Sequence, residues 1–88
     1  MDFDTYLRPR EKLVQHGPSA LNDAELLQLI LGPGSSSSSG AIVARRVEVL
    51  IKDGPLGYDS LVQTDGIGDA KACRVLALVE LAGRLGSL

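Results

Sequence analysis

Apolar residues recur at helical spacing in five stretches of this chain, and glycine or proline separates most of them. Pro9 can open the first helix, because the first turn does not need the amide that proline lacks, and Gly17 ends it. In the second stretch, Asp23–Leu31, Asn22 is the expected N-cap, and Glu25 three residues later completes a capping box. This second helix is apolar almost all round, so we expect it at the centre of the core.

Three more helices are predicted in the second half of the chain. One spans about Ala41 to Lys52, with apolar and charged residues on opposite faces, and a short one lies near Ser60. The last runs from Asp69 to about Leu85 and has two apolar strips. The strips consist of Ala72, Val75, Leu76 and Val79, and of Ala70, Cys73, Ala77 and Leu81. A helix of this kind packs on both sides or lends one side to a partner, and Cys73 is expected to be a small core residue.

The segment Gly66-Ile67-Gly68, before the last helix, is typical of the turn in a helix-hairpin-helix. Glycine at both ends allows positive φ, the isoleucine is expected to point inward, and the small Ala72 lets two helices approach closely. The first amides of the last helix then face solvent, with the positive end of the helix dipole behind them, which favours a phosphate. The residues predicted to bind DNA phosphate are Gly66, Ile67, Gly68, Lys71 and Arg74. A tight turn without a ligand is the alternative.

Composition limits the classes of function. The chain has 88 residues, 44% of them hydrophobic and only 3% aromatic, which suits one small aliphatic core. A net charge of −2 argues against a strongly basic nucleic-acid module, so any DNA contact should involve few phosphates and depend on salt. The single cysteine excludes an internal disulfide. Because no signal peptide or membrane-spanning run is visible, we expect a cytoplasmic location and no membrane partner.

Arg8, Arg10 and Lys12 form the most basic stretch of the chain. They are a candidate second DNA-binding patch, although three cations on a short helix are more often simply a solvated face. The run Ser35–Ser39 is of low complexity and is expected to be a mobile linker rather than a phosphate ligand.

The predicted architecture is an all-α tandem helix-hairpin-helix bundle of four to five helices, of the type of RuvA domain 2 and SAM-like domains. The predicted boundaries are a flexible lead-in (1–7) and a single helical domain (8–88), with a first hairpin (8–32), a Gly/Ser linker (33–40), a connecting helix (41–54) and a second hairpin (55–88). A hairpin alone cannot bury its apolar face, so the two halves should pack together.

Several motifs occur together in a fixed order. They are Arg8-Pro9-Arg10-Glu11-Lys12-Leu13, Glu25-Leu26-Leu27, Gly66-Ile67-Gly68, Ala70-Lys71-Ala72 and Glu80-Leu81-Ala82 with Arg84. Over nearly the whole chain, this order resembles the opening region of RadC-like proteins (UPF0758), a JAB-domain family once linked to DNA repair. The resemblance implies a helical N-terminal domain of the tandem helix-hairpin-helix type. In that family a zinc-dependent JAB domain with a His-x-His and Asp motif follows, and this sequence contains no such motif.

The chain departs from the family pattern at several places, and one of them is the segment from Gly54 to Thr64, which is shortened. Five serines follow Gly34 where the family has a turn with a basic residue. Asp65 and Asp69 flank the predicted phosphate loop, and each carboxylate would repel a phosphate by about 1 kcal/mol. Tight DNA binding is therefore not expected.

Two functions compete. The first is a non-catalytic, sequence-independent DNA-binding module that contacts the DNA backbone. The second is a protein-interaction or structural module, which positions a catalytic domain or forms a homodimer through Leu78 or Ala82 on the far side of the last helix. No catalytic residue, cofactor or metal ligand is expected, because helix capping explains Asp23 and a helix C-terminus explains His16. The resemblance implies that a full-length protein would be a JAB-type metallo-hydrolase.

Overall fold

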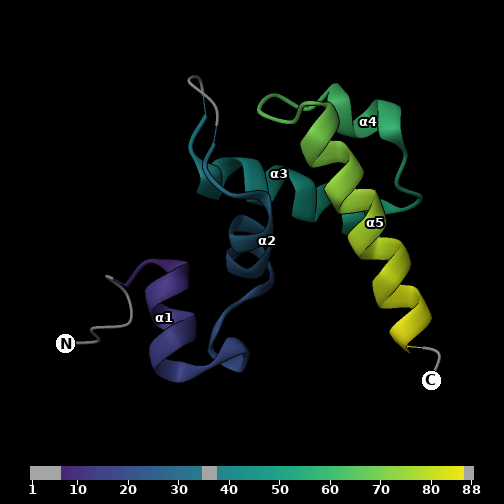
Figure 1. Ribbon diagram of the computed structural model, residues 1–88. Coiled ribbons are helices and arrows are strands. Elements are labelled where there is room, and N and C mark those ends of the chain that lie inside the picture. Colours follow the sequence, from purple (N-terminus) through teal and green to yellow (C-terminus); the bar gives the residue numbers. More distant parts are fainter. Residues whose placement is uncertain (1–6, 35–37, 87–88) are drawn as a thin grey trace.

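A computed structural model describes residues 7–34 and 38–86, and the regular structure within these ranges is entirely helical (Figure 1). The elements are α1 (Pro9–His16), the short 3-10 helix η2 (Pro18–Ala20), α2 (Asp23–Leu31), α3 (Gly40–Asp53), α4 (Tyr58–Val62) and α5 (Asp69–Gly86). The all-α class is confirmed, and each predicted helix is present with its ends within a residue or two of those expected. The predicted lead-in lies almost entirely outside the described residues.

Both predicted helix pairs, α1 with α2 and α4 with α5, are in contact, but the most extensive packing lies elsewhere. The main partner of α2 is α3, and α1 packs on α2 less extensively (Figure 1). The helix expected to connect two halves is therefore itself half of the tightest helix pair. The reason is the apolar face of α3, where Val43, Ala44 and Val47 are all buried, whereas α1 buries none of its residues. The helices α4 and α5 do pack together, as predicted.

The core lies where α2, α3, α4 and α5 meet. Its buried side chains are Leu27, Leu31, Val43, Ala44, Val47, Leu61, Ile67, Ala72 and Val75. The helix α2 buries only Leu27 and Leu31, and Ile30 on its outer side is 40% exposed. Because α2 packs against α1, α3 and α5, it lies at the centre of the helix arrangement, as expected, although it is not buried all round.

Only one of the two apolar strips of α5 is buried. Ala72 and Val75 are completely covered, while Cys73, Ala77 and Leu81 are exposed. The prediction that Cys73 belongs to the core is therefore wrong: each residue of a helix is turned by about 100° from the one before, and this step carries Cys73 away from the core. The last turns of α5 extend beyond the other helices (Figure 1).

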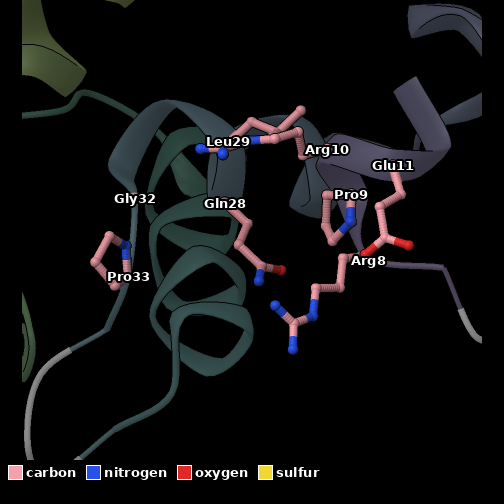
Figure 2. Close-up of a pocket in the computed structure, with 8 residues that line it drawn as sticks. All are labelled: Arg8, Pro9, Arg10, Glu11, Gln28, Leu29, Gly32 and Pro33. Carbon is pink, nitrogen blue, oxygen red and sulfur yellow. The ribbon is translucent and has the colours of Figure 1, made fainter. Parts of the chain in front are cut away.

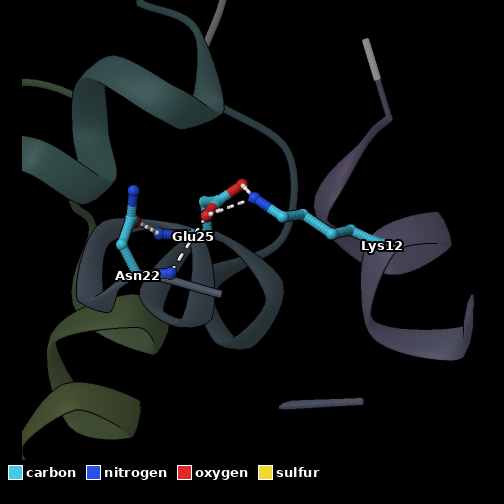
Figure 3. A network of polar contacts seen from close by, with 3 residues as sticks. All are labelled: Lys12, Asn22 and Glu25. Carbon is cyan, nitrogen blue, oxygen red and sulfur yellow. Dashed lines mark hydrogen bonds and ion pairs between the residues drawn. The ribbon is translucent and has the colours of Figure 1, made fainter. Parts of the chain in front are cut away.

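The predicted capping box at the start of α2 is confirmed (Figure 3). The Glu25 amide donates to Asn22 Oδ1 at 2.8 Å, and the Asn22 amide donates to Glu25 Oε1 at 3.0 Å. The same carboxylate forms an ion pair with Lys12 Nζ at 3.3 Å. Glu25 therefore caps α2 and also holds α1 against it.

Candidate phosphate-binding loop and basic hollow

The loop between α4 and α5 depends on one glycine. Gly66 has φ +93°, and a Cβ at this position would lie 2.5 Å from Cγ2 of the buried Val43. Ile67 is buried, as predicted, and its amide donates to the Thr64 carbonyl at 3.0 Å. Gly68 does not have positive φ, and a Cβ there would meet nothing within 4 Å. The requirement for glycine is therefore confirmed for Gly66 and wrong for Gly68.

The first turn of α5 presents backbone amides to solvent. The first bond of the helix runs from the Ala72 amide to the Gly68 carbonyl at 3.0 Å, so the amides of residues 69–71 have no acceptor within the helix. Arg74, one turn further on, is exposed and makes no hydrogen bond or ion pair with any described residue. An anion at this end would meet unpaired donors and the positive end of an 18-residue helix.

The two carboxylates beside the loop both accept hydrogen bonds from other side chains. Asp65 Oδ2 accepts from the Ser38 hydroxyl at 2.9 Å and lies 3.5 Å from Arg46 Nη1. Arg46 also donates to the Asp65 carbonyl at 3.1 Å and to Ser38 Oγ at 2.9 Å. Asp69 Oδ1 accepts from the Tyr58 hydroxyl at 2.7 Å, and this hydrogen bond raises the pKa of Tyr58. These contacts offset part of the repulsion that the carboxylates would exert on a phosphate.

The end of the serine run belongs to this polar network. Ser38 is 6% exposed, and Ser39 accepts a hydrogen bond from the Ile42 amide at 3.3 Å and so caps α3. Residues 35–37 of the predicted linker lie outside the described residues. For Ser38 and Ser39, the expectation of a mobile linker does not hold, since both side chains are bonded.

Lys71 lies between the loop and the turn that follows α2. Its Nζ donates to the Pro33 carbonyl at 2.7 Å. An ammonium group has three donors, so this bond leaves two for another acceptor. The predicted lysine therefore belongs to the first turn of α5, and its side chain also ties that turn to the turn after α2.

A hollow of about 450 Å³, which we call the basic hollow, lies beside the same turn (Figure 2). It is lined by Arg8, Pro9, Arg10, Glu11, Gln28, Leu29, Gly32 and Pro33. Arg8, the residue before α1, and Gln28 of α2 extend into one space (Figure 2). Neither Arg8 nor Arg10 makes a hydrogen bond or ion pair with a described residue, whereas Lys12 is paired with Glu25 and does not line the hollow. Two of the three cations of the predicted second patch thus line one hollow, with their guanidinium groups on different sides of it (Figure 2).

A second hollow, of about 410 Å³, is apolar and lies between α2, α3 and the second half of α5. Its lining consists of Leu26, Leu27, Ile30, Ile51, Leu78, Val79 and Ala82, with Asp23, Glu48 and Lys52. Lys52 Nζ contacts Asp23 Oδ2 at 3.3 Å and Glu48 Oε2 at 3.0 Å, and these partners raise the pKa of Lys52. We call this surface the apolar groove. It contains Leu78 and Ala82, the two positions that the sequence suggested for interaction.

Residues 7–34 and 38–86 contain neither a membrane-crossing helix nor a cluster of metal ligands. None of their helices has the length and hydropathy that crossing a membrane requires. No three His, Cys, Asp or Glu side chains in these ranges are grouped so that they could hold a metal ion.

The Arg46–Ser38–Asp65 contacts and the Tyr58–Asp69 bond were not predicted from the sequence. Ser38 and Asp65 are 27 positions apart, and no local pattern links them. The only signal for the bond between Tyr58 and Asp69 was that Tyr58 is one of just three aromatic residues in the chain.

Comparison with known proteins gives a consistent result. A family model described as UPF0758 N-terminal matches residues 1–73. A UPF0758 protein of Methanospirillum hungatei is 41% identical over 87 residues, which cover 98% of this chain and 39% of that protein. UPF0758 proteins of Carboxydothermus hydrogenoformans (42%, covering 89% of this chain and 36% of the relative) and Rubrobacter xylanophilus (45%, covering 90% and 37%) are also similar. The chain therefore spans well under half the length of these curated relatives. No solved structure matched the chain.

Proposed function

The chain belongs to the UPF0758 family of RadC-like proteins, and on this premise we propose that it is a non-catalytic, cytoplasmic module that binds the DNA backbone without regard to sequence. The family description names a region and no activity, so the support for binding comes from the site itself. The observation that carries the proposal is the open first turn of α5, where three amides and Arg74 face solvent while Asp65 and Asp69 are engaged by other donors. We interpret α4, the loop and α5 as a helix-hairpin-helix.

The proposed contact is small. One phosphate would accept hydrogen bonds from the amides of residues 69–71, with Lys71 and Arg74 as the nearby cations. Because few cations are involved and the chain has a net charge of −2, we expect an affinity of about micromolar or weaker at low salt. For two phosphates on duplex DNA, the logarithm of the affinity should fall against the logarithm of salt with a slope of about −2.

The test is a fluorescence anisotropy titration of labelled duplex and single-stranded DNA with matched charge reversals. Arg74→Glu should weaken binding by about tenfold or more, because it replaces a cation near the phosphate with an anion. Arg84→Glu is the control: it makes the same charge change on the same helix, about 15 Å further along, where Arg84 pairs only with Glu80 at the surface. Equal weakening by both variants, or no binding by the unmodified chain, would contradict the proposal.

Lys71→Glu should also weaken binding, by repulsion at the first turn of α5. This variant loses the bond to the Pro33 carbonyl as well, so its circular dichroism and thermal unfolding must be compared with those of the parent chain. If Lys71→Glu folds normally and binds DNA as well as the parent, Lys71 has no part in the site.

A second candidate function is self-association through the apolar groove. The apolar residues of α5 are the observation that favours it. The same helix lines the groove with Leu78, Val79 and Ala82 and projects Leu81 and Leu85, which are 54% and 58% exposed. A two-fold dimer needs a self-complementary surface, and a helix with both a hollow and projecting leucines provides one. Because Lys52 offsets one of the two carboxylate charges at the edge, the repulsion between two copies is reduced there.

Sedimentation or light scattering of two variants, each with a new arginine, tests this candidate. Ala82→Arg would put a charge in the groove and should give a monomer. Val14→Arg is the control, since Val14 is 76% exposed on α1 and lies outside both the groove and α5. A parent chain that is monomeric at all concentrations would exclude the dimer.

A further inference from the structure

The basic hollow has the charge and shape of a site for a chain end. We propose that it binds the terminal phosphate of a DNA strand, so that the domain prefers phosphorylated ends to uninterrupted DNA. This inference rests on the proposed DNA binding at α5 and adds to it a class of substrate.

The first argument is charge. Arg8 and Arg10 line one hollow and have no hydrogen-bonding or ionic partner among the described residues, in a chain whose net charge is −2. A terminal phosphate has about −1.5 to −2 charges at neutral pH, against one for each phosphate within a strand. Arg8 extends its guanidinium beside the Gln28 amide, whereas Arg10 extends its guanidinium over Leu29 (Figure 2). Each offers donors in a planar fork that suits phosphate oxygens.

The second argument is shape. A phosphate inside a duplex continues into the strand on both sides, so it is best met by an exposed helix end such as that of α5. A hollow of about 450 Å³ with side chains around it is better suited to a group that ends the chain. The side-chain amide of Gln28 can donate to a third phosphate oxygen, and the rings of Pro9 and Pro33 provide apolar walls beside the terminal sugar.

The third argument is position. Pro33 lines the hollow and its carbonyl accepts from Lys71 Nζ, so the hollow and the first turn of α5 border the same short turn. This turn is held in place from behind: a Cβ at Gly40 would lie 3.2 Å from the Gly32 carbonyl oxygen and 3.5 Å from Gln28 Cγ. A strand that ends in the hollow could therefore continue across this turn toward α5.

One group opposes the ligand. Glu11 also lines the hollow, and its carboxylate reduces the local charge from two cations to a net of one. Removal of the Glu11 charge should therefore strengthen the preference for a terminal phosphate, whereas removal of the arginines should weaken it.

The experiment compares three internally labelled oligonucleotides of one sequence, with a 5′-phosphate, a 3′-phosphate or hydroxyl groups only. We expect one phosphorylated form to bind about tenfold more tightly than the hydroxyl form, which corresponds to about 1.4 kcal/mol. The double variant Arg8→Ala/Arg10→Ala should lose this preference and keep the binding of the hydroxyl form. Glu11→Gln should increase it. Arg45→Ala is the control, since Arg45 is exposed, has no partner among the described residues and lies outside the hollow.

The outcomes separate this inference from the proposed function. Binding of all three oligonucleotides with equal affinity would overturn the terminal-phosphate site and leave backbone binding intact, whereas no binding of any of them would overturn both. A nuclear magnetic resonance titration with a dinucleotide that carries the preferred terminal phosphate, 5′ or 3′, gives an independent readout. The side-chain amide of Gln28 should shift with the phosphorylated dinucleotide and not with its hydroxyl form, and the opposite result would also overturn the site.

Discussion

Replacement of Gly66 by alanine should destabilise the domain strongly. The backbone there has φ +93°, and an L-residue in that region costs about 1–2 kcal/mol. The new Cβ would also lie 2.5 Å from Cγ2 of Val43, whose side chain is buried and cannot turn away into solvent. Overpacking of this kind costs about 1–3 kcal/mol. The free energy of unfolding should thus fall by about 2–5 kcal/mol, or the melting temperature by about 10–30 °C for a domain of this size.

Gly68→Ala, two residues further along the same loop, is a matched control. At Gly68 φ is not positive, and nothing lies within 4 Å of an added Cβ, so this change should alter stability by no more than about 0.5 kcal/mol. Urea unfolding followed by circular dichroism measures both variants. In a Val43→Ala background the clash is removed, and Gly66→Ala should then cost only the backbone share, about 1–2 kcal/mol.

Two results would refute this reasoning. If Gly66→Ala and Gly68→Ala destabilise equally, the positive φ and the contact with Val43 do not determine the turn. If the cost of Gly66→Ala is the same with and without the Val43 side chain, the close approach of the loop to α3 is not present in solution.

Two further predictions concern polar contacts. Glu25→Ala removes the capping box and the ion pair with α1 and should cost about 1–2 kcal/mol in urea unfolding, whereas Glu80→Ala, which breaks an exposed ion pair, should cost less than about 0.5 kcal/mol. In a Tyr6→Phe background, ultraviolet titration should give a pKa for Tyr58 above its ordinary value, and Asp69→Asn should lower it; the same pKa in both would contradict the bond between them. Because the raised pKa belongs to the folded state, the stability it contributes is present at neutral pH and is lost as the pH rises through the pKa of Tyr58.

The helices could be predicted from the sequence because their ends are set by neighbouring residues. Pro9 starts α1, Asn22 and Glu25 form a capping box three residues apart, and Gly32 follows the last residue of α2. The turn at Gly66 was also visible, since its sequence pattern reflects a local backbone requirement. Signals of this kind lie within a few positions of the feature that they predict.

The features that were missed join distant parts of the chain. Lys71 and Pro33 are 38 positions apart, and Ser38 and Asp65 are 27 apart, so composition and periodicity carry no sign of either contact. The same limit explains why the extensive packing of α3 on α2 and the exposure of Cys73 were missed: periodicity shows that a helix has apolar sides but not which side another helix covers.

The most direct test of DNA binding at α5 is a nuclear magnetic resonance titration of the ¹⁵N-labelled chain with a short duplex at low salt. We predict that the largest amide shifts occur at residues 66–71 and at Arg74, and that they reverse when salt is added. Shifts confined to the apolar groove around Leu78 and Ala82, or no shifts at any concentration of DNA, would contradict the proposed function.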